Sequence, residues 1–173
     1  IGDGSFVKNP VFEQAAHHVA KSGGTLHLLG LISSGGVHSS LDHLLALVEF
    51  AQAAGVKKLA IHAILDGRDT PHDSGLKFLS KLQTQLDSVK LGVIASLSGR
   101  YYAMDRDNHW DRIALAYQAM TAAAEAPHAA ESQAALKASY NEKVYDEEFK
   151  PTTIVDAQGQ PLAPIQDGDA VIF

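Results

Sequence analysis

Apolar residues along the chain fall into segments that predict strands and helices in alternation. Short, nearly unbroken apolar runs are typical of strands buried on both faces, whereas apolar residues three and four positions apart are typical of helices that cover a sheet. Strands are predicted over residues 26–32, 58–65 and 93–97. Helices are predicted over residues 10–22, 40–54, 74–89 and 109–123. This alternation favours βαβ units and hence a three-layer α/β/α fold around a mostly parallel sheet.

The last part of the chain departs from this alternation. A helix over residues 131–140 precedes a short strand at 152–155, a turn at 157–160 and an apolar run at 170–173 that is typical of a buried strand. We expect these segments to form a small antiparallel or extended addition to the sheet. Because the chain begins with Ile1 and stops on the apolar run, we also expect that further chain is missing on both sides.

Composition narrows the class of protein. The 173 residues, 46% of them apolar, suffice for one domain with a sizeable core. The net charge of −6 disfavours binding to nucleic acid or to an anionic membrane, and no apolar run approaches the length of about 20 residues that spans a bilayer. The absence of cysteine excludes disulfides, thiol nucleophiles and cysteine-based zinc sites, and points only weakly to a reducing compartment.

Candidate chemistry gathers in three loops that each follow a predicted strand, at residues 33–38, 66–69 and 98–106. In open parallel sheets, ligands bind outside the carboxyl ends of the strands. The chain has ten lysines but only four arginines, and three of these, Arg68, Arg100 and Arg106, lie in the loops. Since guanidinium groups grip carboxylates and phosphates with paired hydrogen bonds, a small anion with two acidic groups is the favoured ligand. The alternative is that Arg68, Arg106 and Arg112 form surface ion pairs with neighbouring aspartates.

Other side chains in these loops have candidate roles of their own. Asp69 is the candidate general acid or base on a hydroxyl, although it could equally cap a helix or pair with a neighbour. His38 could bond a substrate oxygen, and the Gly35-Gly36 backbone could approach an anion. The acidic stretch 105–111 lacks the glycine and the final glutamate of a calcium loop, so no metal site is predicted in this chain.

Several strings in the chain closely resemble the cofactor-independent phosphoglycerate mutase family. They are GGVHS, LDGRDT and SGRYYAMDRDNHWDR, with DGSF at the start and IQDGDAVIF at the end. The resemblance implies a glycolytic isomerase with an alkaline-phosphatase-like domain, which carries a serine nucleophile and two manganese ions. It also implies a second domain, inserted into the first, that grips 3-phosphoglycerate or 2-phosphoglycerate without 2,3-bisphosphoglycerate as cofactor. Residues 1–173 resemble the inserted, substrate-binding domain only.

Carried over by position, the resemblance implies substrate contacts for five residues: His38, Arg68, Asp69, Arg100 and Arg106. Asp69 would transfer protons to and from the glycerate hydroxyls. The second histidine of the family's GGVHSH string is Ser40 here, and the family's next substrate-binding arginines follow beyond Phe173. The nucleophile and metal ligands would lie on the phosphatase-like domain of the same chain.

The resemblance also implies a setting for the protein, and it leaves two other functions open. A monomer in the cytoplasm, with no nucleic-acid or membrane partner, is expected, and the 173 residues alone should be inactive. One alternative is a non-catalytic α/β module that binds small anions. A weaker alternative is a metal-dependent phosphohydrolase that uses the acidic loops.

Overall fold

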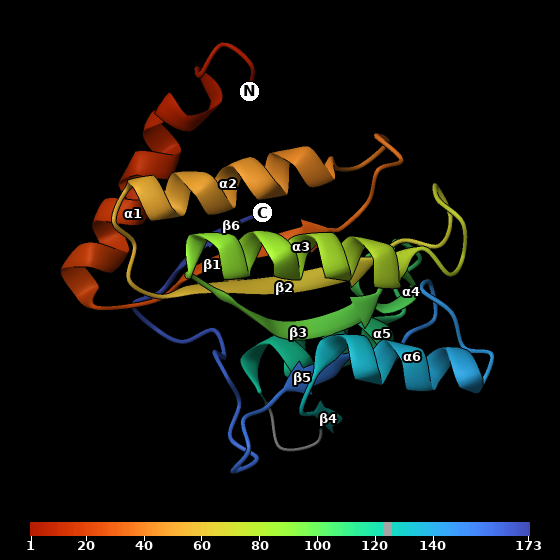
Figure 1. Ribbon diagram of the computed structural model, residues 1–173. Helices are drawn as coiled ribbons and strands as arrows, with labels where there is room; N and C mark the ends of the chain where they lie inside the picture. The colour runs from red at the N-terminus through yellow and green to blue at the C-terminus, as the bar shows by residue number, and fades with distance from the viewer. Residues whose placement is uncertain (123–125) are drawn as a thin grey trace.

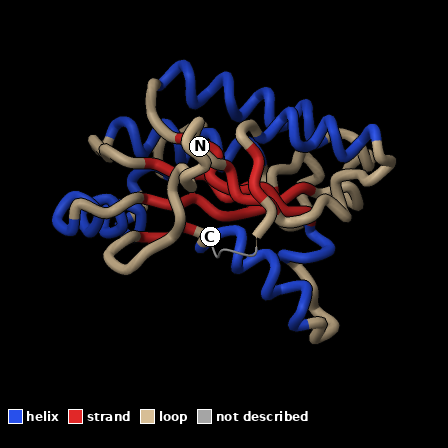
Figure 2. Tube along the Cα trace, turned by 90° about the horizontal axis from the view of Figure 1, so that it is seen from below, coloured by secondary structure: helices blue, strands red, loops and turns tan. Residues whose placement is uncertain are grey.

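The computed structural model describes residues 1–122 and 126–173. A six-stranded sheet in the order β4-β5-β3-β2-β1-β6 forms its centre, and helices lie on both sides of it (Figures 1 and 2). The strands are β1 (Leu26–Leu31), β2 (Leu59–Leu65), β3 (Val93–Gly99), β4 (His128–Ala129), β5 (Thr152–Ile154) and β6 (Ala170–Ile172). The helices are η1 (Phe6–Lys8), α1 (Pro10–Ser22), α2 (Leu41–Ala53), α3 (Gly75–Val89), α4 (Arg100–Ala103), α5 (Trp110–Thr121) and α6 (Ser132–Asn141). The predicted α/β class and its mostly parallel sheet are confirmed.

Local sequence explains where the first helix begins and ends. The Asn9 side chain accepts a hydrogen bond from Val11 N, and Pro10 occupies the first helical position, where its missing N–H is not needed. Gly23 ends the helix with a φ of 74°, a left-handed conformation that glycine adopts without strain. Helix α5 stops at Thr121. Residue 123, the predicted end of this helix, lies outside the described residues.

The main core lies between the sheet and helices α1, α2, α3 and α6. Strand β2 is buried along its whole length, as expected for a central parallel strand with both faces covered. Leu28, Ile61 and Leu97 of the sheet belong to this core, together with Val48 of α2 and Leu79 of α3. Helix α5 contacts β3 and β5, and the Thr153 hydroxyl of β5 donates to Ala119 O of α5. None of the helices in the described residues has the length and apolar character needed to cross a membrane.

The carboxyl-terminal segments differ in part from the prediction. Strand β5 is antiparallel to β3, as expected for the addition, but β6 runs parallel to β1 at the opposite edge of the sheet. Residues 170–172 form a strand, as predicted, but this strand is half-buried to exposed and not buried, because within the described residues β6 pairs with β1 on one side only. The chain reaches this edge after crossing from β5, and the Asp169 carboxylate fixes its entry by accepting a hydrogen bond from Thr25 N at 2.7 Å.

A buried chain of hydrogen bonds crosses the sheet on the side of α5. Asp169 Oδ2 lies 3.0 Å from His27 Nε2, His27 Nδ1 lies 2.9 Å from His62 Nε2, and His62 Nδ1 lies 2.8 Å from Ser96 Oγ. Because a carboxylate only accepts hydrogen bonds, His27 donates to Asp169, His62 donates to His27, and the Ser96 hydroxyl donates to His62. This direction satisfies every member of this hydrogen-bonded chain with both histidines neutral, and His62 is a buried core residue.

Burial makes this chain of hydrogen bonds sensitive to acid. It lowers the pKa of His62 from 6.5 to about 3, and it also lowers the pKa of His27 despite the opposing effect of Asp169. Between pH 6.5 and about 3, the unfolded protein binds a proton at His62 that the folded protein excludes. The contribution of His62 to the free energy of unfolding is therefore full above pH 6.5 and falls as the pH is lowered toward 3. Each such histidine changes the free energy of unfolding by up to about 1.4 kcal/mol per pH unit.

We therefore expect His62→Gln to flatten the pH dependence of stability. Glutamine retains an N–H donor and an oxygen acceptor but does not titrate. Urea denaturation of this chain at several pH values between 6.5 and 5 should give a slope smaller by about 1 kcal/mol per pH unit in the variant. Equal slopes in the two proteins would contradict the neutral, buried state of His62.

Candidate functional site

The three predicted loops meet at one edge of the sheet. Strands β1, β2 and β3 are parallel, with Leu31 paired to Ile64 and Ile64 paired to Ser98, so their carboxyl ends lie side by side (Figure 1). The third loop is shorter than predicted, because Ser98 and Gly99 extend β3 and residues 100–103 form the short helix α4. Arg100 therefore stands at the junction of strand and helix, directly beside the loop that carries Asp69.

Asp66 is the buried centre of this edge. Its carboxylate accepts hydrogen bonds from the Ser33 hydroxyl at 2.5 Å and from Arg100 Nη1 at 2.6 Å. It also accepts from the backbone N–H groups of Arg68 and Asp69. Burial on its own would raise the pKa of Asp66, but these hydrogen bonds outweigh it and hold the pKa below its usual value. The ionised carboxylate therefore ties together the loops that follow β1, β2 and β3.

Arg100 joins Asp66 to the candidate acid–base residue. Arg100 Nη1 also donates to Asp69 Oδ2 at 2.7 Å, so both hydrogens of this nitrogen are used. Burial alone would lower the pKa of Arg100, but the hydrogen bonds and charges of Asp69 and Asp66 raise it. Its Nε and Nη2 groups form a second edge of the guanidinium, and such an edge can bind an anion through two parallel hydrogen bonds.

The first loop packs against Asp69. His38 Nε2 lies 3.8 Å from Asp69 Oδ2, which is close enough for an ionic interaction but too long for a hydrogen bond. A Cβ at Gly35 would come within 2.8 Å of Asp69 Cβ, so only glycine permits this approach. The expected role of the Gly35 N–H in anion binding is not supported, since it already donates to Ser33 Oγ. Ser40 is the N-cap of α2.

The loop between α4 and α5 is organised by Asp105. Its carboxylate accepts from the N–H groups of Asp107 and His109, from His109 Nδ1 and from Arg112 Nη1 at 3.3 Å. Burial would raise the pKa of Asp105, but the hydrogen bonds lower it. Asp105, Asp107 and His109 each place one possible metal-ligand atom within 4.8 Å of the others. The donors around Asp105 account for this arrangement as loop structure.

Two of the three arginines in the ion-pair alternative, Arg112 and Arg68, form ion pairs of different kinds. Arg112 pairs with Asp105, an aspartate near it in the sequence, as predicted under that alternative. The Arg112 guanidinium also lies 3.9 Å from the centre of the Tyr101 ring. Arg68 does not pair with an adjacent aspartate. Its Nε donates instead to Oε1 of Glu147, a residue 79 positions away that the sequence did not single out.

All five predicted site residues line a single cleft of about 370 Å³. It also includes Arg112, so all four arginines of the chain border the same space. Its lining residues are His38, Arg68, Asp69, Arg100, Tyr101, Met104, Asp105, Arg106, Asp107 and Arg112. The cleft thus combines four guanidinium groups with three carboxylates, of which Asp69 faces His38 and Arg100. Such a lining suits a small ligand with more than one acidic group.

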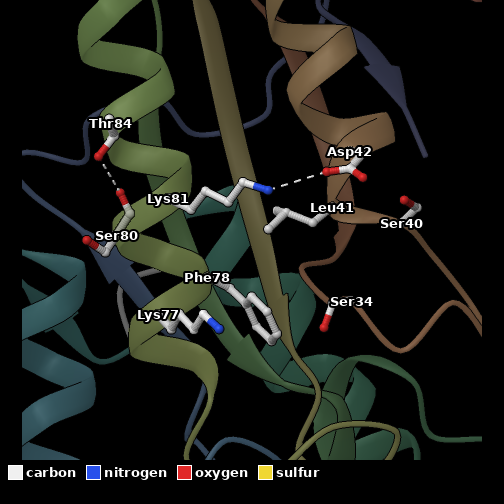
Figure 3. A pocket seen from close by; sticks show the side chains of 9 residues that line it. All are labelled: Ser34, Ser40, Leu41, Asp42, Lys77, Phe78, Ser80, Lys81 and Thr84. Carbon is white, nitrogen blue, oxygen red and sulfur yellow. Dashed lines mark hydrogen bonds and ion pairs between the residues drawn. The ribbon is translucent and has the colours of Figure 1, made fainter. Parts of the chain in front are cut away.

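A separate groove of about 640 Å³ lies between α2 and α3 (Figure 3). Lys81 Nζ of α3 reaches toward Asp42 Oδ1 of α2 at 3.4 Å across this groove. None of the five predicted site residues lines it. We therefore place the candidate site in the cleft at the strand ends.

Comparison with known proteins points to the family that the sequence resembles. The family model described as "BPG-independent PGAM N-terminus" matches residues 1–173. The 2,3-bisphosphoglycerate-independent phosphoglycerate mutase of Thermomicrobium roseum is 50% identical over 173 residues, which are 100% of this chain and 33% of that protein. The corresponding protein of Myxococcus xanthus is 48% identical over 170 residues, 98% of this chain and 33% of that protein.

A solved structure extends the comparison to the fold. Leishmania mexicana phosphoglycerate mutase, crystallised at low cobalt concentration, superposes with a TM-score of 0.91 and 34% identity over 98% of this chain and 32% of that one. The chain thus spans about a third of the length of the relatives it matches. Since the family model covers every residue from Ile1 to Phe173, this chain belongs to the family of the N-terminal region of BPG-independent phosphoglycerate mutases.

Proposed function

We propose that residues 1–173 are the substrate-binding domain of a cofactor-independent phosphoglycerate mutase that interconverts 3-phosphoglycerate and 2-phosphoglycerate. The observation that carries this proposal is the convergence of four arginines and Asp69 in one cleft. Phosphoglycerate bears a carboxylate and a phosphate on three carbons, which matches a cleft rich in guanidinium groups. The phosphatase-like domain, inferred to flank this one on both sides in the longer protein, would carry the serine nucleophile.

Most of the proposed site residues hold the substrate, and one residue, Asp69, transfers protons. Arg68, Arg100 and Arg106 bind the carboxylate and the phosphate, and His38 contacts an oxygen of the substrate. The phosphoryl group passes to the serine of the other domain, and glycerate stays bound in the cleft. Because glycerate is retained and reorients, attack of its other hydroxyl on the phosphoserine is effectively intramolecular.

Asp69 supplies the acid–base chemistry in this scheme. It gives a proton to the glycerate oxygen that loses the phosphoryl group and takes the proton of the hydroxyl that attacks in the second transfer. Its position supports this role, since Arg100 Nη1 donates to its Oδ2 at 2.7 Å and His38 Nε2 lies 3.8 Å from the same oxygen, inside the cleft. Two manganese ions, bound on the phosphatase-like domain, would stabilise charge on the transferred phosphoryl group. Neither they nor 2,3-bisphosphoglycerate need a site in this chain, and we place the protein, as a monomer, in the glycolytic pathway of the cytoplasm.

Assays of the full-length protein and of this chain test the proposal. The full-length protein should convert 3-phosphoglycerate to 2-phosphoglycerate without added 2,3-bisphosphoglycerate, and the 173-residue chain alone should not. Activity of the chain alone would contradict the division of labour between the domains. A full-length protein that binds 3-phosphoglycerate without converting it would favour a non-catalytic anion-binding module.

A further inference from the structure

We propose that Glu147 is a positioning residue for substrate binding, which acts by orienting the guanidinium group of Arg68. The inference rests on the proposed function of the cleft and adds a residue that does not itself line it. Glu147 lies between α6 and β5, far along the chain from the loops that carry the arginines. Its carboxylate nevertheless reaches Arg68, one of the arginines of the site.

The contact between the two side chains determines which edge of the guanidinium is free. Arg68 Nε donates to Glu147 Oε1 at 2.5 Å. The bond fixes the Nε side of the group, so the Nη1 and Nη2 edge remains for a ligand in the cleft that Arg68 lines. The Arg68 side chain is 57% exposed, and without this contact little else in the described residues would restrict its rotamers.

Glu147 is suited to this task because its own backbone is held firmly. Glu147 O accepts a hydrogen bond from Tyr101 N at 3.0 Å. A Cβ at Gly67 would come within 2.8 Å of Glu147 N, and a Cβ at Gly99 would overlap Glu147 O, so the strand-end loops pack directly on this backbone. The preceding residue, Asp146, is fully buried and accepts from Gly75 N at 2.7 Å. Glu147 is therefore anchored to both loops that carry site arginines.

Neither stability nor simple electrostatics explains a carboxylate at this position. An ion pair with so exposed an arginine contributes little to folding. A negative charge beside an anion site also weakens anion binding through Coulomb repulsion. Orientation of Arg68 is the remaining benefit of the carboxylate. If charge alone mattered, removing the Glu147 carboxylate would strengthen substrate binding. If Glu147 orients Arg68, removing the carboxylate should weaken substrate binding.

The test compares two neighbouring substitutions in the full-length protein, with 3-phosphoglycerate as the substrate. Glu147→Met removes the acceptor and should raise KM about tenfold, with kcat changed less than about threefold. Glu147→Gln keeps an oxygen acceptor and should recover part of the loss. The control is Glu148→Met, which removes the same charge from an exposed neighbour and should leave KM unchanged or lower it. Melting temperatures should agree within about 2 °C, as expected for an exposed ion pair.

A double-mutant cycle asks whether Glu147 acts through Arg68. In the Arg68→Met background, Glu147→Met should change KM by less than about twofold, because the group that it orients is absent. A KM for Glu147→Met equal to that of Glu148→Met would overturn the inference, and so would a tenfold effect that persists without Arg68. An inactive wild-type protein would instead overturn the proposed function, and this inference with it.

Discussion

Asp69→Asn is expected to lower the kcat of the full-length protein about a hundredfold while leaving the fold intact. Asparagine has nearly the same shape and can still accept a hydrogen bond from Arg100, but its amide neither takes nor gives a proton at neutral pH. KM should change much less than kcat, since the arginines that hold the substrate remain. Steady-state kinetics in both directions of the reaction would measure the effect.

The control for this substitution is Asp42→Asn. The Asp42 side chain is 75% exposed on α2 and pairs with Lys81, outside the cleft. Asp42→Asn removes the same charge as Asp69→Asn and should leave kcat unchanged. A kcat for Asp69→Asn within a factor of about three of the wild type would remove Asp69 from the acid–base role.

Arg100→Lys is expected to lower kcat/KM about a hundredfold, although the positive charge is kept. The Arg100 guanidinium bridges Asp66 and Asp69 through Nη1 and still offers a second edge to the substrate. A lysine ammonium is a point charge. It cannot bond the two carboxylates and, at the same time, bind an anion with paired hydrogen bonds. Because Asp66 is buried, the variant should also lose some stability, which thermal denaturation would report.

Arg112→Lys is the comparison for Arg100→Lys. It makes the same chemical change in the same cleft, but Arg112 contacts Asp105 and stacks on Tyr101 instead of touching Asp69. We expect a loss in kcat/KM of less than about tenfold. Equal losses for the two substitutions would mean that the cleft needs positive charge in general and not the bridge that Arg100 makes.

The sequence predicted those parts of the fold that depend on local pattern. The apolar runs of β1, β2 and β3 and the helices between them follow from burial on both faces of a parallel sheet. The parallel direction of β6 was missed, because three residues of edge strand carry no signal for the partner they join. Strand β4 has two residues and was not predicted for the same reason.

The site shows the same division between local and long-range information. The five residues could be placed together because the carboxyl ends of parallel strands share one edge of the sheet. Their partners could not be predicted. Arg68 bonds Glu147 rather than a neighbouring aspartate, and Arg100 bonds both Asp66 and Asp69, contacts that arise only when distant segments pack.

A crystal structure of the full-length protein with bound 3-phosphoglycerate tests most directly whether the cleft holds the substrate. We predict that the carboxylate and phosphate of the ligand lie within hydrogen-bond distance of Arg68, Arg100 and Arg106, and that Asp69 lies beside a glycerate hydroxyl. A ligand bound elsewhere on the domain, with these four side chains free of it, would contradict the account.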